Sequence, residues 1–178
     1  MLDFASSVGL DGASILEIGG GIGDIQIHAL KRGAAHTTNV ELSAAYETEA
    51  ARLLDEEGLR GRATRVLGVD LAASPEAVEP ADIVVLHRVV CCYPDYERLL
   101  RAACGRSKRA VVFSHPPYNP MTRVTARVMN AVYALTRNPY RAFAHSPEAM
   151  VGVLRRGGFD PRYRERSGPW HVVGAVRR

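Results

Sequence analysis

Short apolar segments of four or five residues alternate along this chain with longer segments whose apolar positions recur at helical spacing. The short, β-rich segments are typical of strands, and the longer ones of helices. The predicted strands are Ser14–Ile18, Thr37–Val40, Ala63–Leu67, Asp82–Leu86 and Ala110–Phe113. The predicted helices are Asp24–Arg32, Ser43–Glu57 with Ser43 as its N-cap, Tyr96–Ala103, Met121–Arg137 and Pro147–Arg156.

This alternation predicts an α/β fold, a single doubly wound, mostly parallel sheet with helices on both faces. The segments Phe159–Arg166 and His171–Val176, joined by Ser167–Pro169, predict a C-terminal antiparallel hairpin. We expect His115–Pro120 to be a loop, because its three prolines do not suit a helix or a central strand. The length of 178 residues suits one domain, residues 1–178, with a short N-terminal extension at 1–12.

The strongest functional signal is the glycine-rich segment Glu17–Gly23, directly after the first predicted strand and directly before a helix. Glycines are needed where the backbone adopts positive φ and where a ligand lies against the main chain. In an open α/β sheet, ligands bind in the crevice beyond the carboxyl ends of the strands. The segment therefore predicts a ligand-binding turn.

A dinucleotide-binding fingerprint, G-x-G-x-x-G, is one interpretation of this segment. Placing Gly19 and Gly21 at its first two glycines puts Asp24 at the third, and a carboxylate there disfavours a pyrophosphate. Starting at Gly20 instead puts Ile22 and Ile25 at the remaining glycine positions. Both registers argue against a dinucleotide.

The same residues resemble motif I of the class I S-adenosylmethionine (SAM)-dependent methyltransferases, E/D-x-G-x-G-x-G, matched at Glu17, Gly19, Gly21 and Gly23. The resemblance extends through most of the chain. It implies a Rossmann-like methyltransferase fold, with SAM bound by these residues together with Gly20. Glu17 has an alternative role, which is to accept hydrogen bonds from the turn's own amides.

Further cofactor contacts follow from the resemblance. In that family the acidic residue that ends the second strand holds the ribose hydroxyls, and Glu41 occupies that place, with Leu42 beside it. A carboxylate suits two adjacent hydroxyl donors because it accepts through both oxygens. Asp70 is expected to meet the adenine amino group, and Leu71 to supply an apolar wall.

Two histidines at the ends of predicted strands are candidates for a general base. His87 lies in Ala81–Asp95, which resembles the family's fourth-strand motif and loop, so it is also a predicted cofactor or acceptor contact. His115 follows the fifth strand. A base is needed only if the acceptor must lose a proton, and histidine titrates near neutrality. A purely structural role for either histidine stays open.

Composition narrows the choice of partners and location. The net charge is +4, and many arginines lie late in the chain, a bias that would attract an acidic substrate or a nucleic acid, although an arginine-rich overall composition explains most of it. No basic segment is interleaved with aromatics, which disfavours nucleic acid. The cysteines Cys91, Cys92 and Cys104 form no C-x-x-C pair, and we find no metal-ligand cluster. No apolar segment reaches the roughly 18 residues of a membrane span, and no signal sequence is evident, so we expect a cytoplasmic protein.

These observations predict a SAM-dependent methyltransferase that acts on a small molecule, carboxylate-bearing or aromatic, with O-methylation slightly favoured. A nucleic-acid or protein methyltransferase and a non-catalytic SAM-binding partner subunit are the alternatives. Cys92–Asp95 does not match the N/D-P-P-Y/F/W tetrad of amino-methylating enzymes. Because only about a dozen residues precede the first strand, we expect that the helix from Met121 covers the site, or that the domain is incomplete or needs a partner. A homodimer stays open.

Overall fold

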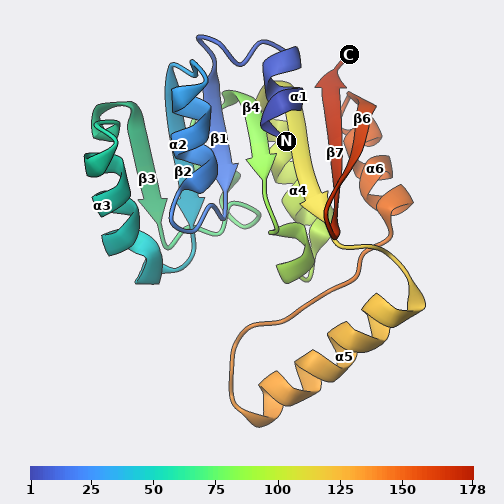
Figure 1. Ribbon diagram of the computed structural model, residues 1–178. Coiled ribbons are helices and arrows are strands. Elements are labelled where there is room, and N and C mark those ends of the chain that lie inside the picture. Colours follow the sequence, from blue (N-terminus) through green and yellow to red (C-terminus); the bar gives the residue numbers. More distant parts are fainter.

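The computed structural model describes residues 1–178, and its centre is one seven-stranded sheet (Figure 1). The strand order is β3-β2-β1-β4-β5-β7-β6. The first five strands along the chain pair in parallel, whereas β7 is antiparallel to both β5 and β6. The strands are β1 (Ser14–Ile18), β2 (His36–Glu41), β3 (Ala63–Leu67), β4 (Ala81–Leu86), β5 (Ser107–His115), β6 (Phe159–Ser167) and β7 (Trp170–Arg177).

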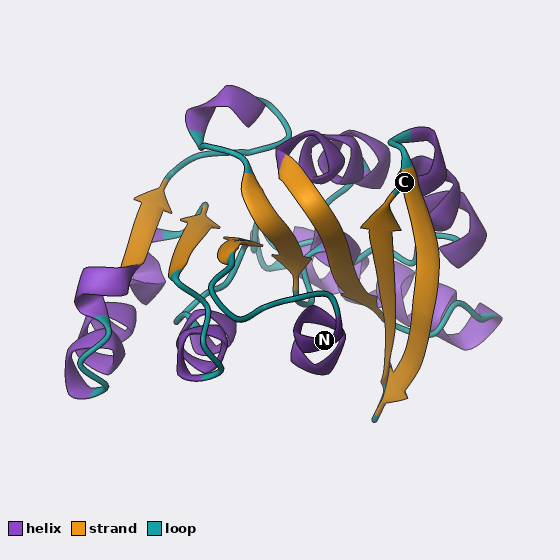
Figure 2. Cartoon of the chain, turned by 90° about the horizontal axis from the view of Figure 1, so that it is seen from above, coloured by secondary structure: helices purple, strands orange, loops and turns teal.

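Helices lie on both faces of the sheet (Figure 2), as the sequence predicts. The helices are α1 (Leu2–Ser7), α2 (Asp24–Lys31), α3 (Glu47–Glu56), α4 (Tyr96–Arg106), α5 (Pro120–Leu135) and α6 (Pro147–Arg156). The segment predicted as one helix from Ser43 is a short 3-10 turn, Ala44–Tyr46, followed by α3. The doubly wound, mostly parallel sheet and the C-terminal hairpin are confirmed.

The two faces carry separate cores, and β4 shows why. Its residues Ile83 and Val85 pack into the core beneath α1 and α2, while Val84 and Leu86 pack into the core beneath α4 and α6. Successive side chains of a strand point to opposite faces of the sheet, so a strand that is buried on both faces has apolar residues at successive positions. This explains why the alternation of segments predicts the layers correctly.

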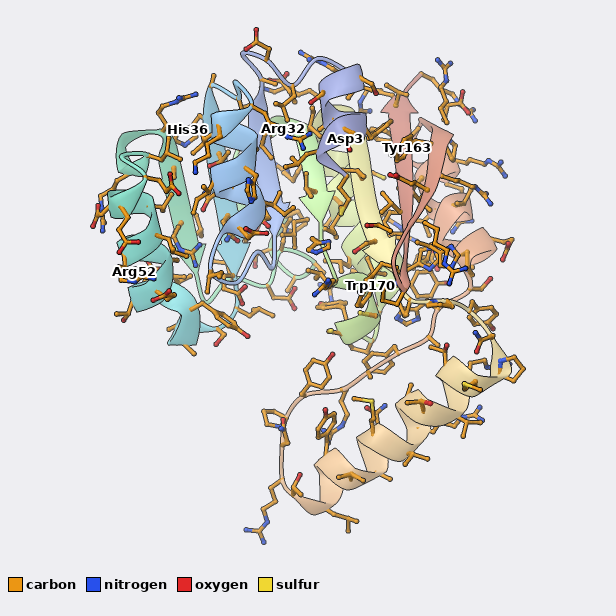
Figure 3. The ribbon with its side chains drawn as sticks, in the orientation of Figure 1. Asp3, Arg32, His36, Arg52, Tyr163 and Trp170 are labelled. Carbon is orange, nitrogen blue, oxygen red and sulfur yellow. The ribbon has the colours of Figure 1, made fainter.

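The N-terminal helix α1 is packed against the sheet and against α2. The ring of Phe4 lies over Gly174 of β7, where an added Cβ would stand 2.7 Å from it. It also lies against the Tyr163 ring in a tilted arrangement, with centroids 5.1 Å apart and an interplanar angle of 33°. Asp3 pairs with Arg32 at the end of α2 at 2.5 Å (Figure 3). The residues before β1 therefore form part of the fold rather than a loose extension.

The structure corrects the predicted loop His115–Pro120 at both ends. His115 is the last residue of β5, paired with His171 of β7, because the hairpin extends β5 beyond its apolar centre. Pro120 is the first residue of α5, where the missing N–H costs nothing. The Asn119 side chain caps this helix by accepting from the Thr122 amide at 2.8 Å.

Helix α5 stands away from the sheet (Figure 1) and contains no buried residue. The chain returns from it through residues 136–146, where the Phe143 amide donates to the carbonyl oxygen of Cys91 at 2.7 Å. Asn130 holds this return segment by donating to and accepting from Ala142, each at 2.8 Å. None of the helices combines the length and apolar character that a bilayer crossing requires.

Candidate functional site

A crevice of about 350 Å³ opens beyond the carboxyl ends of the parallel strands, where the segments after β1, β2, β3 and β4 meet. Ligands of α/β proteins bind at this edge of the sheet. Tyr140, from the segment that follows α5, also lines the crevice, although it is far in sequence from the other residues of the wall, which lie between Ile18 and Leu99. The residues of its wall are Ile18, Gly19, Gly21, Val40, Glu41, Leu42, Ser43, Tyr46, Val69, Asp70, Leu71, Arg88, Val89, Cys92, Tyr93, Leu99 and Tyr140.

The glycine turn forms one wall of the crevice, and its backbone requires glycine. Gly19, Gly21 and Gly23 have φ values of 65°, 53° and 86°, in the left-handed region that side chains disfavour. No atom lies within 4 Å of the place where a Cβ on Gly21 would stand. Gly21 thus presents bare main chain to open space beside the crevice.

Glu17 lies beneath this turn and is 1 % exposed. A Cβ on Gly20 would stand 2.3 Å from the Glu17 carboxyl carbon and 2.5 Å from Nδ2 of Asn39, so both side chains support the turn from below. The Gly20 amide donates to Oδ1 of Asn39 at 3.1 Å, and Oε2 of Glu17 has no hydrogen-bond partner. Burial raises the pKa of Glu17 to about 8.

Glu41 connects the turn to the chain after β2. Its Oε2 accepts from the Gly21 amide and its Oε1 from the Ser43 amide, each at 2.9 Å. A carboxylate has about four acceptor positions, so both oxygens keep capacity for further donors. Glu41 is 8 % exposed and lines the crevice, with the exposed Leu42 beside it.

Asp70 is fixed on the opposite segment. Its Oδ1 accepts from the Ala72 amide at 3.0 Å, and its Oδ2 accepts from the hydroxyl of Tyr93 at 2.8 Å. Burial, together with this carboxylate, raises the pKa of Tyr93 to about 12. Leu71, which is 2 % exposed, adds an apolar surface beside Asp70.

The chain after β4 contributes residues that sequence reasoning did not place in the crevice. Arg88 has a φ of 60°, unusual for a residue with a side chain, and its amide donates to Oγ of Ser114 at 2.9 Å. Its guanidinium lies over the Trp170 ring, 5.1 Å from the centroid. Cys92 Sγ lies 2.9 Å from the Tyr140 hydroxyl. Nothing in the local sequence indicates that Tyr140 returns to this edge.

The two predicted histidines are not brought together. His87 follows β4 but does not line the crevice. Its ring instead contacts Met1 and Ser114, with Nδ1 3.2 Å from Sδ of Met1 and 3.3 Å from Oγ of Ser114. His115 lines a different cavity, where its ring stacks on His171. Burial lowers the pKa of both His87 and His115.

Of the predicted site residues, six therefore share the crevice wall and five do not. The six are Gly19, Gly21, Glu41, Leu42, Asp70 and Leu71. The five outside it are Glu17, Gly20, Gly23, His87 and His115.

Comparison of the sequence with known protein families agrees with the class of protein that the fold, the glycine turn and the crevice indicate. A family profile described as "Methyltransferase domain" matches residues 16–110, more than half of the chain. The chain belongs to this family. It is an enzyme of the SAM-dependent methyltransferases, with SAM as its methyl donor.

Solved structures show the same fold. The magnesium protoporphyrin IX methyltransferase from Synechocystis PCC 6803, with bound SAH, is 19 % identical, with a TM-score of 0.77, over 99 % of this chain and 79 % of that one. An O-methyltransferase family protein from Burkholderia thailandensis is 21 % identical, with a TM-score of 0.75, over 99 % of this chain and 55 % of that one.

The mitomycin 7-O-methyltransferase is 22 % identical, with a TM-score of 0.70, over 98 % of this chain and 52 % of that one. The chain thus spans only about half the length of these last two proteins. At such identities the similarity establishes the fold. No curated protein sequence matches the chain.

Proposed function

We propose that this enzyme transfers the methyl group of SAM to a small-molecule acceptor, with an oxygen atom as the favoured methylation site. The observation that carries the proposal is the crevice itself. It combines the bare backbone of Gly21 with two fixed carboxylates, Glu41 and Asp70, and an apolar surface that includes Leu71. Its volume of about 350 Å³ is in the range of small-ligand pockets.

The residues of the crevice fit an adenosyl ligand. In this proposal Glu41 receives the ribose hydroxyls, because each of its oxygens already accepts one backbone amide and retains a free acceptor position. Asp70 receives the adenine amino group, and Leu71 packs against the base. Gly19 and Gly21 let the ligand lie against the main chain. Glu17, Gly20 and Gly23 set the conformation of the turn from outside the crevice.

When bound, SAM supplies a methyl group already activated by its sulfonium. The main task of the protein is then to hold the acceptor in line with that group, which is a matter of proximity and orientation. Neither His87 nor His115 lines the crevice, so we assign orientation of the acceptor to three other side chains of its wall. Those side chains are Arg88, Cys92 and Tyr140.

An apolar groove beside the crevice supports a small, apolar acceptor. It has a volume of about 350 Å³, lies between α5 and the segments after β4 and β5, and shares Tyr140 with the crevice. Its side chains include Met121 and Met129 of α5, Phe143 and Trp170. An aromatic or otherwise flat acceptor suits this lining, because its binding would remove apolar surface of both the acceptor and the groove from water.

Calorimetric titration with SAM and with S-adenosylhomocysteine tests the cofactor assignment. We expect saturable binding of both, abolished in Gly21→Ala. Gly58→Ala is the matched control, because Gly58 also has positive φ, 65°, and no atom within 4 Å of its Cβ position, but lies outside the crevice. Binding of neither ligand to folded protein, or equal loss in both variants, would contradict the assignment.

Incubation of the enzyme with a metabolite extract and SAM labelled in its methyl group tests the acceptor class. We expect the label in a small molecule, attached to oxygen. Label that enters only protein or nucleic acid would overturn the small-molecule proposal while leaving the cofactor assignment intact.

A further inference from the structure

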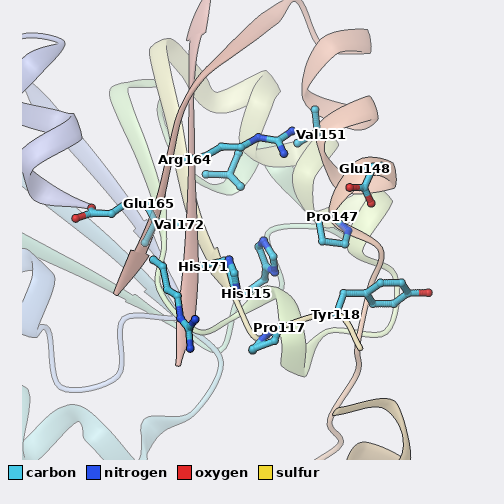
Figure 4. A pocket seen from close by; sticks show the side chains of 12 residues that line it. His115, Pro117, Tyr118, Pro147, Glu148, Val151, Arg164, Glu165, His171 and Val172 are labelled. Carbon is cyan, nitrogen blue, oxygen red and sulfur yellow. The ribbon is translucent and has the colours of Figure 1, made fainter. Parts of the chain in front are cut away.

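A second cavity, of about 540 Å³, lies beside the crevice edge of the sheet, between the ends of β5, β6 and β7 and the start of α6 (Figure 4). It shares no residue with the crevice, and it meets the apolar groove at Pro117. Its polar side chains come mostly from the three strands, and the proposed methyl transfer uses none of them.

Strand pairing places basic side chains in one row across this cavity. His115 of β5 pairs with His171 of β7, which in turn pairs with Arg166 of β6. Residues directly opposite each other in a sheet point to the same face. Arg164 lies two residues before Arg166 and therefore shares that face. The four side chains form what we call the basic row.

The histidines of the basic row are held in place. Their rings stack at 14°, with centroids 5.5 Å apart. Nδ1 of His115 lies 2.8 Å from the carbonyl oxygen of Pro116, and because a carbonyl only accepts, this nitrogen carries the hydrogen. His115 is 5 % exposed, so its ring forms a fixed inner wall of the cavity.

The arginines of the row lack acidic partners. The guanidinium of Arg164 makes no hydrogen bond or ion pair, and that of Arg166 donates only to the carbonyl oxygen of Gly168, at 3.1 Å. Glu165 points away from the cavity (Figure 4) and accepts from the hydroxyl of Tyr163 on the other face. Glu148 is the remaining carboxylate of the wall, 3.3 Å from Oγ of Ser146.

We propose that this cavity is a second ligand site, which binds the oxyanion group of a small molecule, a carboxylate or a phosphate. Two guanidinium groups face one carboxylate, which leaves the cavity positively charged, and guanidinium groups bind planar oxyanions through paired hydrogen bonds. The rigid histidine wall limits how far the ligand enters. The site does not depend on SAM, so the proposal stands or falls separately from the proposed methyl transfer.

Nuclear magnetic resonance of the histidine ring signals tests this site in the whole chain. Benzoate and inorganic phosphate are titrated separately, with chloride holding the ionic strength constant, so the two arms distinguish a carboxylate ligand from a phosphate ligand. We expect a saturable shift confined to His115 and His171 with at least one probe. Shifts that never saturate, or that chloride alone reproduces, would overturn the proposal.

Two substitutions separate the row from the general positive charge of β6. Arg164→Gln is expected to weaken binding of the effective probe roughly tenfold, as loss of a hydrogen bond to a charged group does. Arg162→Gln, on the same strand, is the matched control, because Arg162 pairs with Asp160 and lies outside this cavity. Equal weakening in both variants would contradict a specific site.

Discussion

The hydroxyl of Tyr93 donates a 2.8 Å hydrogen bond to Oδ2 of Asp70 and thereby joins the segment after β4 to the segment after β3 at the crevice. The carboxylate that we assign to the adenine group is therefore oriented by a residue from another strand. Orientation of this kind is fixed before a ligand arrives, which lowers the entropy lost on binding.

Replacement of this tyrosine tests the orientation of Asp70. Tyr93→Phe is expected to weaken binding of S-adenosylhomocysteine roughly fivefold, from the loss of about 1 kcal/mol of hydrogen bonding. Calorimetry measures the effect. Tyr46→Phe is the control, because Tyr46 also lines the crevice but is 44 % exposed and its hydroxyl makes no hydrogen bond to Asp70. Equal loss in the two variants would argue against the orienting role.

Glu41 offers a test of the ribose assignment. Both carboxylate oxygens of Glu41 accept backbone amides, and Glu41→Gln replaces one of these acceptors by an amide donor. We therefore expect SAM affinity to fall at least roughly tenfold. Glu49→Gln, on the exposed side of α3, is expected to leave calorimetric affinity unchanged. Full affinity in Glu41→Gln would refute the assignment.

Gly20 is expected to tolerate no side chain, because of packing rather than backbone conformation. A methyl group there would meet Glu17 and Asn39, so Gly20→Ala is expected to lower the free energy of unfolding by about 1 to 3 kcal/mol. Gly61→Ala meets nothing within 4 Å and is the control. Urea denaturation measures both, and an unaltered midpoint in Gly20→Ala would show that the turn moves aside.

The buried carboxyl of Glu17 is expected to make stability depend on pH. Its pKa is raised to about 8 in the folded protein, whereas an unfolded glutamate titrates near 4.5. Between these values the folded state holds one more proton than the unfolded state, so stability falls as the pH rises from about 4.5 to about 8. Glu17→Gln is expected to flatten this dependence in urea denaturation. An unchanged slope would show that Glu17 is ionised when buried.

Cys92 is expected to react fastest among the thiols. The hydrogen bond from Cys91 lowers the pKa of Cys92, and Tyr140 adds to this, whereas burial raises the pKa of Cys104 to about 11. Alkylation by iodoacetamide at pH 7, followed by mass spectrometry, is expected to modify Cys92 first. Saturating S-adenosylhomocysteine is expected to slow it. Unslowed reaction would place Cys92 away from the bound ligand.

Local patterns predicted most of the fold correctly. The bounds of Ser14–Ile18, Ala63–Leu67 and Pro147–Arg156 agree with β1, β3 and α6, because apolar segments and caps that define them lie within the segments themselves. His115 was misplaced because the end of β5 depends on pairing with β7, distant in sequence. Such pairing leaves no local signal.

The candidate site was predicted in part for the same reason. The family motif located Gly19, Gly21, Glu41 and Asp70, all of which line the crevice. The sequence does not distinguish a residue beside a ligand from one beneath the turn, as Glu17 shows. Tyr140 reaches the crevice only because the chain folds back after α5, a path that no spacing rule describes.

Because α5 contributes no side chain to either core, substitutions along it leave the packing of the sheet unaffected. The same helix supplies part of the groove assigned to the acceptor. Substitutions in this one helix can therefore change acceptor preference with little effect on folding, while the crevice assigned to the cofactor is formed by the ends of the sheet's strands.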